Sequence, residues 1–396
     1  MSPLSVTSFT LASSLGHGVE TAVHALTRAA SGLRRNDFLD CGLETYIGRV
    51  DGVEDEKLPD RLSRFDCRSS KLAQLGLRHD GFANEVARAA TRHGASRIGV
   101  FVGTSSSGIL EAELGFRKRD PATGALPSTL SFRETYCLYS VTEFVQRSLS
   151  LGGPAVTVSS ACSSSAKVFA TAARAIAAGL CDAAVVGGVE TLCFTTLHGF
   201  GSLALLSRER CRPCDESRDG ISIGEAAAFA LLEPGEARGA ELALLGYGES
   251  SDAHHMSTPH PQGEGAAQAM RAALASAGLN PPDIDYVNLH GTGTRNNDAA
   301  EDIAVYSVFG DAVACSATKG STGHALGAAG AVEAVITLLC LRERFIPGTA
   351  NSTRVDSTFR SKVQLAGSNR PIGNAMTNSF GFGGSNCSLV FGRPWN

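Results

Sequence analysis

Cys162 is the side chain in this sequence with the clearest potential for nucleophilic chemistry. It follows the β-branched run VTV and a short polar turn, and it precedes an alanine-rich stretch that is typical of a helix. A helix dipole favours an anion at the helix N-terminus by about 0.3–1 kcal/mol, and by up to ~2 kcal/mol when the site is partly buried. Although most cysteines are buried structural residues, this pattern predicts a reactive thiol whose pKa is lowered by roughly one unit.

Two histidines and a lysine form a second group of candidate residues. His290 ends a predicted buried strand and opens the loop HGTGT, whereas Lys319 and His324 lie in the segment KGSTGH that leaves another strand. Side chains at strand ends are well placed for an active site. A single histidine is usually structural, but two strand-end histidines with a loop lysine indicate a functional site.

A glycine-rich loop is the fourth candidate segment. In NSFGFGG a predicted strand breaks into Gly381, Gly383 and Gly384 around Phe382. Glycine permits positive φ angles and the close approach of a ligand to the backbone. We therefore expect this loop to border a bound ligand.

These segments need a scaffold of buried strands and covering helices. Short β-branched runs alternate with alanine-rich stretches, which predicts a parallel α/β architecture with helices packed outside the strands. The predicted strands are 98–103, 155–159, 183–187, 286–290, 313–317 and 375–378, and the predicted helices are 162–178, 265–277, 298–308 and 326–342. The Pro-Gly and Arg-Gly pairs within 233–240 predict a boundary between two halves, 1–237 and 238–396.

Composition narrows the class of protein. The 396 residues are 43% hydrophobic and 19% charged, and the net charge of -4 gives no general attraction to nucleic acid or to anionic membranes. The first 18 residues lack a basic n-region, and the apolar stretch 326–341 is interrupted by Glu333 and is too short to span a bilayer. The 11 cysteines suit reduced thiols. These features predict a soluble, cytoplasmic protein.

A metal site is not predicted. Cys211 and Cys214 form a single C-x-x-C pair without a second pair at zinc-binding spacing. We therefore expect no zinc at this pair.

The motifs ACSSS, HGTGT, KGSTGHALGAAG and NSFGFGG, in this order, resemble the β-ketoacyl-[acyl-carrier-protein] synthase family of the thiolase superfamily. The resemblance is to the elongating, Cys-His-His type and covers most of the chain. It implies the α/β thiolase fold, in which two similar α/β/α halves form a five-layered α-β-α-β-α core. It also implies a dimer, an acyl carrier protein as partner, and no cofactor beyond the phosphopantetheine that carries the substrates.

The resemblance also implies a role for each main residue. Cys162 accepts the acyl group, His290 and His324 act in decarboxylation of a malonyl thioester, and Lys319 supports them as a cation. The backbone N–H groups of Cys162 and Phe382 form the oxyanion hole, where each such donor is worth roughly 2.7–4 kcal/mol. The implied reaction is a decarboxylative Claisen condensation that extends a fatty acid, polyene or polyketide chain by a ping-pong course.

Further residues match family positions near the substrate. Phe382 resembles the gate of the acyl pocket, and Thr292 and Thr294 resemble residues that bind the phosphopantetheine arm. Glu301 is a supporting residue near the catalytic lysine, and Ser106 stands where a bulkier apolar residue is common, which leaves room for a longer or more rigid acyl chain. Each has a structural alternative: a core phenylalanine, hydroxyls that stabilise a loop, or a charge at a helix N-terminus.

Because carrier proteins are acidic, a basic entrance is expected. The candidates are Arg117, Lys118, Arg119 and Arg208, although such charges more often form a solvated surface.

Several alternatives stay open from the sequence. They are the ketosynthase subunit of a heterodimer with a nucleophile-less chain-length partner, a thiolase-like acyltransferase, an initiating synthase, and a cysteine hydrolase. The loop GFGGSN lacks the second cysteine of a thiolase, and Lys319 with His324 favours the elongating type. The triple serine after Cys162 and the segment GISIGEAAAF resemble a branch that builds aryl polyene pigments.

Overall fold

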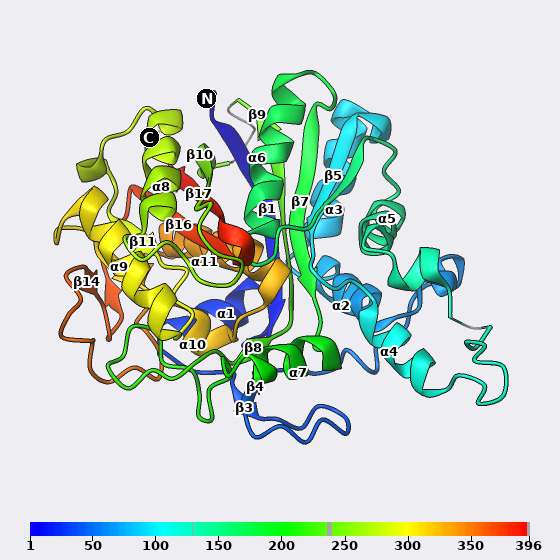
Figure 1. Ribbon diagram of the computed structural model, residues 1–396. Coiled ribbons are helices and arrows are strands. Elements are labelled where there is room, and N and C mark those ends of the chain that lie inside the picture. The colour runs from blue at the N-terminus through cyan, green and yellow to red at the C-terminus, as the bar shows by residue number, and fades with distance from the viewer. Residues whose placement is uncertain (129, 236–239, 394–396) are drawn as a thin grey trace.

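Two six-stranded β-sheets organise the chain (Figure 1). The computed structural model describes residues 1–128, 130–235 and 240–393. The first sheet has the order β2-β1-β9-β7-β5-β6. Its strands are β1 (Leu4–Ser13), β2 (Gly16–His17), β5 (Ile98–Gly103), β6 (Ala155–Val158), β7 (Ala183–Glu190) and β9 (Ala226–Pro234).

The second sheet is built from later residues and has the order β10-β17-β16-β11-β12-β14. Its strands are β10 (Ala243–Ser251), β11 (Tyr286–Asn288), β12 (Ala314–Ser316), β14 (Lys362–Val363), β16 (Asn374–Gly381) and β17 (Ser385–Gly392). The predicted boundary between 237 and 238 falls within 236–239, outside the described residues.

The prediction of parallel sheets was wrong in part, because both sheets are mixed. β5, β6 and β7 are parallel, as are β11, β12, β14 and β16, but β9 pairs antiparallel with β1 and β7, and β17 pairs antiparallel with β10 and β16. β16 and β17 are joined by only Phe382–Gly384, and so short a connection permits only an antiparallel pair. A continuous apolar run shows that a strand is buried, but it does not show the strand's direction.

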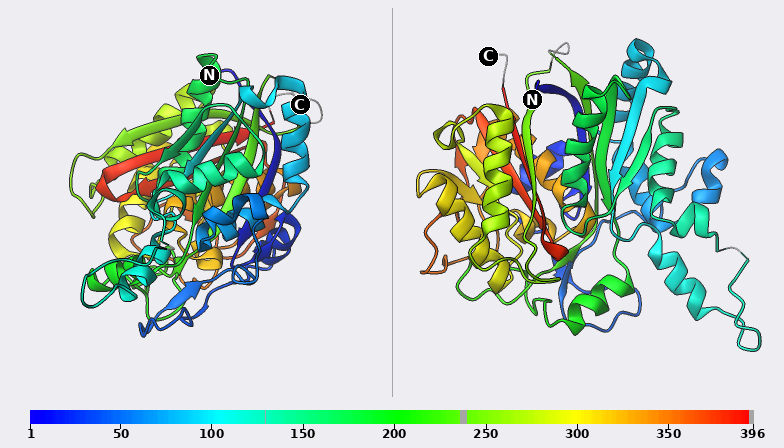
Figure 2. Two further views of the ribbon diagram at one scale, coloured as in Figure 1. Left: turned by 90° about the vertical axis from the view of Figure 1, so that its right-hand side faces the viewer. Right: turned by 45° about the horizontal axis from the view of Figure 1, so that its top comes forward.

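Helices form three layers around these sheets (Figures 1 and 2). α6 (Ser164–Ala177) and α11 (Ala329–Glu343) lie between the sheets and share one apolar core with both of them. α2 (Arg68–Leu77), α3 (Phe82–His93) and α5 (Tyr139–Ser148) cover the outer face of the first sheet, and α8 (Glu264–Ala277) and α9 (Arg295–Phe309) cover that of the second. The result is the predicted α-β-α-β-α arrangement.

The remaining elements connect these layers. They are α1 (Val19–Leu26), β3 (Arg34–Arg35), β4 (Tyr46–Gly48), α4 (Ile109–Arg117), α7 (Phe194–Ser202), β8 (Ile223–Gly224), α10 (Lys319–Thr322), β13 (Phe345–Ile346) and β15 (Ser368–Asn369). Among the described residues, none of the helices has the length and apolar character needed to cross a membrane.

Candidate active site

Cys162 lies in a tight turn between β6 and α6. Ala161, just before it, has φ of 50°, in the left-handed region that non-glycine residues rarely adopt. Ser164 stabilises the turn, because its hydroxyl accepts a hydrogen bond from Ser160 N at 2.8 Å and donates one to Ala161 O at 2.5 Å. Ser164 thus holds the turn that presents the Cys162 thiol.

Burial dominates the electrostatics of this thiol. The Cys162 side chain is 6% exposed, and burial raises its pKa to about 11. The nearby charge of Lys319 and a backbone hydrogen bond from Phe382 act in the opposite direction but are weaker. The predicted lowering of this pKa was therefore wrong, because the cost of burying a thiolate exceeds the gain from the helix terminus.

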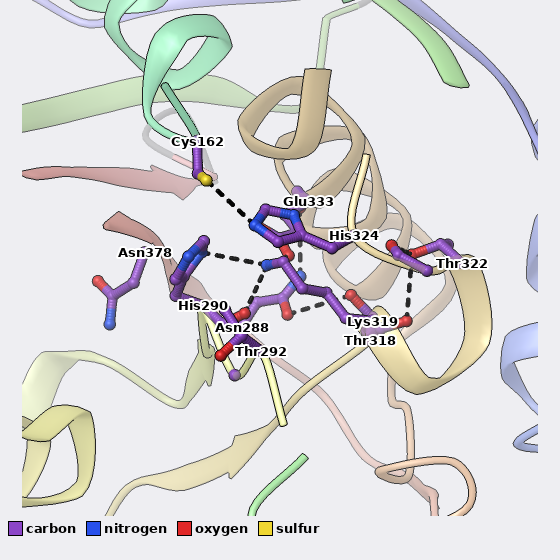
Figure 3. Close-up of polar contacts among 12 residues, drawn as sticks. Cys162, Asn288, His290, Thr292, Thr318, Lys319, Thr322, His324, Glu333 and Asn378 are labelled. Atoms are coloured by element: carbon purple, nitrogen blue, oxygen red, sulfur yellow. Dashed lines mark hydrogen bonds and ion pairs between the residues drawn. The ribbon is translucent and has the colours of Figure 1, made fainter. Parts of the chain in front are cut away.

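Both predicted histidines meet Cys162 from the second half of the chain (Figure 3). His324 Nε2 lies 3.1 Å from Cys162 Sγ, and the rings of His290 and His324 are perpendicular with centroids 5.3 Å apart. One ligand atom from each of the three side chains lies within 4.8 Å of the other two. The thiol and the two imidazoles can therefore act on the same small group.

Lys319 determines how His290 presents its ring. Lys319 Nζ lies 3.1 Å from His290 Nδ1 and 2.5 Å from His290 O, and it forms an ion pair with the buried carboxylate of Glu333. An ammonium group can only donate, so Nδ1 of His290 accepts and its proton lies on Nε2. His290 thus offers a hydrogen-bond donor on its Nε2 side.

Glu333 is a functional candidate that the sequence motifs do not reveal. Its only signal in the sequence is that it is a single acidic residue in an otherwise apolar helix. Burial raises the pKa of its carboxyl to about 7, although Lys319 favours the charged form.

Both imidazoles are neutral near pH 7. Burial lowers the pKa of His290 and of His324 well below the usual value, and Lys319 lowers both further. Nδ1 of His324 has no hydrogen-bond partner among the described residues, so His324 can place its proton on either nitrogen.

Cys162, His290 and His324 are also the kind of side chains that bind a soft metal ion. A metal ligand must offer a lone pair, however, and the bond from Lys319 leaves a proton on the free nitrogen of His290. The group is therefore arranged to donate hydrogen bonds. Cys211 lies outside it, and its thiol donates to Lys319 O at 3.3 Å.

Two acidic side chains hold the HGTGT loop by its backbone. Glu301 accepts hydrogen bonds from His290 N at 2.7 Å and Gly291 N at 2.8 Å, and Asp298 accepts one from Thr292 N at 3.0 Å. Glu301 thus binds the backbone at His290, whereas the carboxylate paired with Lys319 is Glu333.

A cavity of about 490 Å³ opens onto these groups. Its lining includes Cys162, His290, Thr292, Thr294, His324 and Phe382. The Phe382 ring packs on Phe200 with centroids 5.6 Å apart, and Gly383 on its C-terminal side has φ of 80°. The hydroxyls of Thr292 and Thr294 are hydrogen-bonded to each other in the cavity wall, with their oxygens 2.9 Å apart.

The structure places Ser106 outside this cavity lining. Its hydroxyl donates to the buried carboxylate of Glu190, which also accepts a 2.9 Å bond from Ser106 N. The Ser106 hydroxyl is therefore bonded to a buried acid, and its contact with an acyl chain stays a prediction.

The four basic candidates are exposed and lie outside the cavity lining. Arg117 is paired with Asp40 at 2.7 Å and stacks over Phe194 with its guanidinium 4.0 Å from the ring centroid. Arg208 is nearer the cavity in sequence, three residues after the lining residue Leu205. The predicted basic surface therefore comes from two separate segments of the chain, one at 117–119 and one at Arg208.

Comparisons with known proteins agree with this geometry. The family model "Beta-ketoacyl synthase, N-terminal domain" matches residues 42–238, and "Beta-ketoacyl synthase, C-terminal domain" matches residues 242–353. The 3-oxoacyl-[acyl-carrier-protein] synthase 2 of Vibrio cholerae is 34% identical over 420 residues, with 98% of each chain covered. Nodulation protein E of Rhizobium meliloti is 36% identical over 308 residues, covering 75% of this chain and 76% of that protein.

Solved structures of ketosynthases have the same thiolase fold. A chain from the complex of the ketosynthase ApeO with its chain length factor ApeC, from Xenorhabdus doucetiae, matches with a TM-score of 0.88 and 36% identity, covering 99% of this chain and 98% of that chain. A β-ketoacyl synthase from Burkholderia phymatum matches with a TM-score of 0.87 and 29% identity, covering 99% and 100%. From its motifs, its paired sheets and both family models, this chain belongs to the β-ketoacyl synthase family.

Proposed function

We propose that this enzyme catalyses decarboxylative Claisen condensation of an acyl thioester, carried on Cys162, with a malonyl thioester on an acyl carrier protein. The observation that carries the proposal is the contact of His324 Nε2 with Cys162 Sγ at 3.1 Å, beside a His290 ring whose proton is fixed on Nε2 by Lys319. A nucleophile next to a base, with two donors for a developing oxyanion, is what both half-reactions require.

In the first half-reaction, Cys162 Sγ attacks the carbonyl carbon of the acyl thioester. The thiol with its pKa of about 11 is protonated near pH 7, so His324 Nε2 takes its proton as the bond forms. The N–H groups of Cys162 and Phe382 receive the oxyanion. The carrier thiol leaves with a proton, and the acyl group stays on Cys162.

In the second half-reaction, the bond between the malonyl methylene carbon and its carboxylate breaks, and carbon dioxide leaves. The electron pair moves into the thioester carbonyl, whose oxygen accepts hydrogen bonds from Nε2–H of His290 and of His324. The resulting carbanion attacks the acyl carbon on Cys162, and the bond from that carbon to Cys162 Sγ breaks as the new carbon–carbon bond forms. The Cys162 thiolate then takes up a proton from solvent, and the β-ketoacyl product stays on the carrier. Neutral imidazoles suit this task because they donate hydrogen bonds to the enolate oxygen but are too weakly acidic to protonate the carbanion before it attacks.

The arm that delivers both substrates reaches Cys162 through the cavity. Thr292 and Thr294 line its wall, and we propose that their hydroxyls bind the phosphopantetheine amides while Phe382 gates the passage. Relatives named for acyl-carrier-protein substrates support this route. The likeness to a structure of a ketosynthase with its chain length factor supports a role in chain elongation. The segments ACSSS and GISIGEAAAF are our reason for including aryl polyenes among the products that we propose.

We further propose that the enzyme works as a dimer, either of identical chains or with a related chain-length subunit. β6 is an edge strand of the first sheet, with Val156 37% exposed. Near it in the chain, residues 118–128 stand away from the body (Figures 1 and 2), and Phe132, Tyr136 and Leu138 before α5 are exposed. An unpaired edge beside exposed apolar side chains favours pairing with another subunit. The 11 free cysteines support a reducing compartment such as the cytoplasm.

The decisive experiment follows label from malonyl carrier protein into β-ketoacyl product, with a panel of acyl carriers as primers. Cys162→Ala removes the acyl acceptor, so no labelled product and no acyl-enzyme adduct should form. Cys137→Ala, at a partly exposed cysteine, is the matched control and should retain both. Elongation that survives in Cys162→Ala would overturn the proposal.

A further inference from the structure

We propose that Arg295 binds the phosphate of the phosphopantetheine arm at the opening of the cavity, an inference that rests on the proposed function. Arg295 is the first residue of α9 and directly follows the HGTGT loop. Three features support a phosphate-binding role for Arg295: the order of side chains along one wall of the cavity, their exposure and their charge.

The wall formed by residues 290–295 runs from the interior to the surface. His290 is 1% exposed and Thr292 is 6% exposed, Thr294 is partly exposed, and Arg295 is exposed, yet all four line the same cavity. A thioester that reaches His290 must therefore extend past the two threonines and then past Arg295.

The chemistry of this wall matches that of the arm in the same order. A phosphopantetheine thioester has its reacting carbonyl at one end, amide groups along its length and a phosphate at the other end. Imidazole donors lie at the buried end, hydroxyls that donate and accept lie in the middle, and a guanidinium lies at the exposed end. A guanidinium presents paired N–H donors that fit phosphate oxygens.

Arg295 is free to make this contact. Among the described residues that line the cavity, Arg295 is the only lysine or arginine. Its guanidinium forms no hydrogen bond or ion pair with any residue that the structure describes, and only its backbone oxygen accepts a bond, from Arg218. Two arginines that lie near this loop in space are engaged: Arg212 donates to Ser217 at 3.3 Å, and Arg218 pairs with Asp356 at 2.7 Å.

The cavity lining also contains the carboxylates of Asp219 and Asp252, and neither forms an ion pair with Arg295. Asp219 accepts a hydrogen bond from Ser207 at 2.6 Å, and Asp252 accepts one from Asn386 at 2.7 Å. Asn296 and Asn297, which follow Arg295 in the lining, are uncharged and add no repulsion for a phosphate.

The test compares two small extender substrates that differ only in the phosphate: malonyl-phosphopantetheine and malonyl-pantetheine. In Arg295→Ala, the ratio of their kcat/KM values should fall about tenfold or more, through KM, because a charge-assisted hydrogen bond is lost. Arg295→Lys keeps the charge without the paired donors and should lose less. Arg28→Ala, at an exposed arginine after α1, is the control and should leave the ratio unchanged.

A binding measurement separates this inference from the proposed function. Calorimetry of phosphopantetheine itself, with Cys162→Ala and with Cys162→Ala/Arg295→Ala, should show about tenfold weaker binding in the double variant, whether or not the enzyme turns over. The assignment would be overturned if Arg295→Ala lowered kcat/KM equally for both small thioesters, or lowered it only for malonyl carrier protein. Such a result would point to a contact of Arg295 with the carrier's own acidic side chains. Absence of condensation by the wild-type enzyme with every malonyl thioester would instead contradict the proposed function.

Discussion

Lys319 donates a hydrogen bond to Nδ1 of His290 across 3.1 Å, and the same ammonium group forms an ion pair with Glu333. The lysine therefore connects a carboxylate buried in the middle helix layer to the imidazole that faces the cavity. Its charge fixes the tautomer of His290 and compensates Glu333 in an interior where either group alone is costly.

Lys319→Met tests both consequences. The free energy of unfolding should fall by about 3–5 kcal/mol because Glu333 loses its partner, and condensation should fall by ~10²-fold or more because His290 is no longer held as a donor. Lys319→Met/Glu333→Leu should recover stability in denaturant unfolding without recovering condensation. If the double variant regained activity, Lys319 would be purely structural.

His290→Ala should separate the two half-reactions. Cys162 keeps its contact with His324, so acyl transfer to Cys162 should continue and be visible by intact mass. Release of labelled carbon dioxide from malonyl carrier protein should fall by ~10²–10³-fold, because a donor to the enolate oxygen is lost. Decarboxylation at the wild-type rate would exclude His290 from that step.

The pH dependence of Cys162 alkylation should report its burial. Only the thiolate reacts, and a pKa of about 11 means that the thiolate fraction rises about tenfold per pH unit below that value. Iodoacetamide labelling at Cys162, measured by mass spectrometry, should therefore keep rising from about pH 6 to pH 10. A plateau near neutral pH would instead reveal a thiolate–imidazolium pair with His324.

Gly381→Ala should displace the loop of Phe382 from the nucleophile. A Cβ at Gly381 would lie 2.9 Å from Ser160 O and 3.2 Å from Cys162 N, closer than such contacts normally allow. We expect acylation of Cys162 to slow by ~10-fold or more as the oxyanion donors separate. Gly42→Ala, where a Cβ meets nothing within 4 Å, is the control. Equal rates for the two variants would show that this close approach is dispensable.

Local patterns were sufficient for most of the scaffold. The strand predicted at 98–103 has those bounds as β5, and the helix predicted at 162–178 is α6 from Ser164 to Ala177. α9 begins at Arg295, three residues before its predicted start, and α11 begins at Ala329 after a short 3-10 turn. Hydrophobic periodicity identifies such elements, but their ends depend on capping and on the turn before them.

Contacts between distant segments could not be predicted. The partner of Ser106 is Glu190, 84 residues away. The pairing of Lys319 with Glu333 requires α11 to lie beside α10, which carries the lysine. The prediction of a lowered pKa for Cys162 was wrong for the same reason. The sequence shows that a helix begins there, whereas the depth at which the thiol is buried depends on packing between both halves. Residue types and motif order predicted which side chains meet, and long-range packing decides how they are charged.

The middle helix layer has a consequence for gene duplication. The turn before α6 presents Cys162 from the first half, while the second half supplies the histidines and the wall that ends at Arg295. A duplicated copy could therefore lose the thiol through one codon change and keep the cavity wall and the apolar core that joins the halves. Paralogous subunits that no longer condense, yet still hold a chain or a carrier, lie a single mutational step from this architecture.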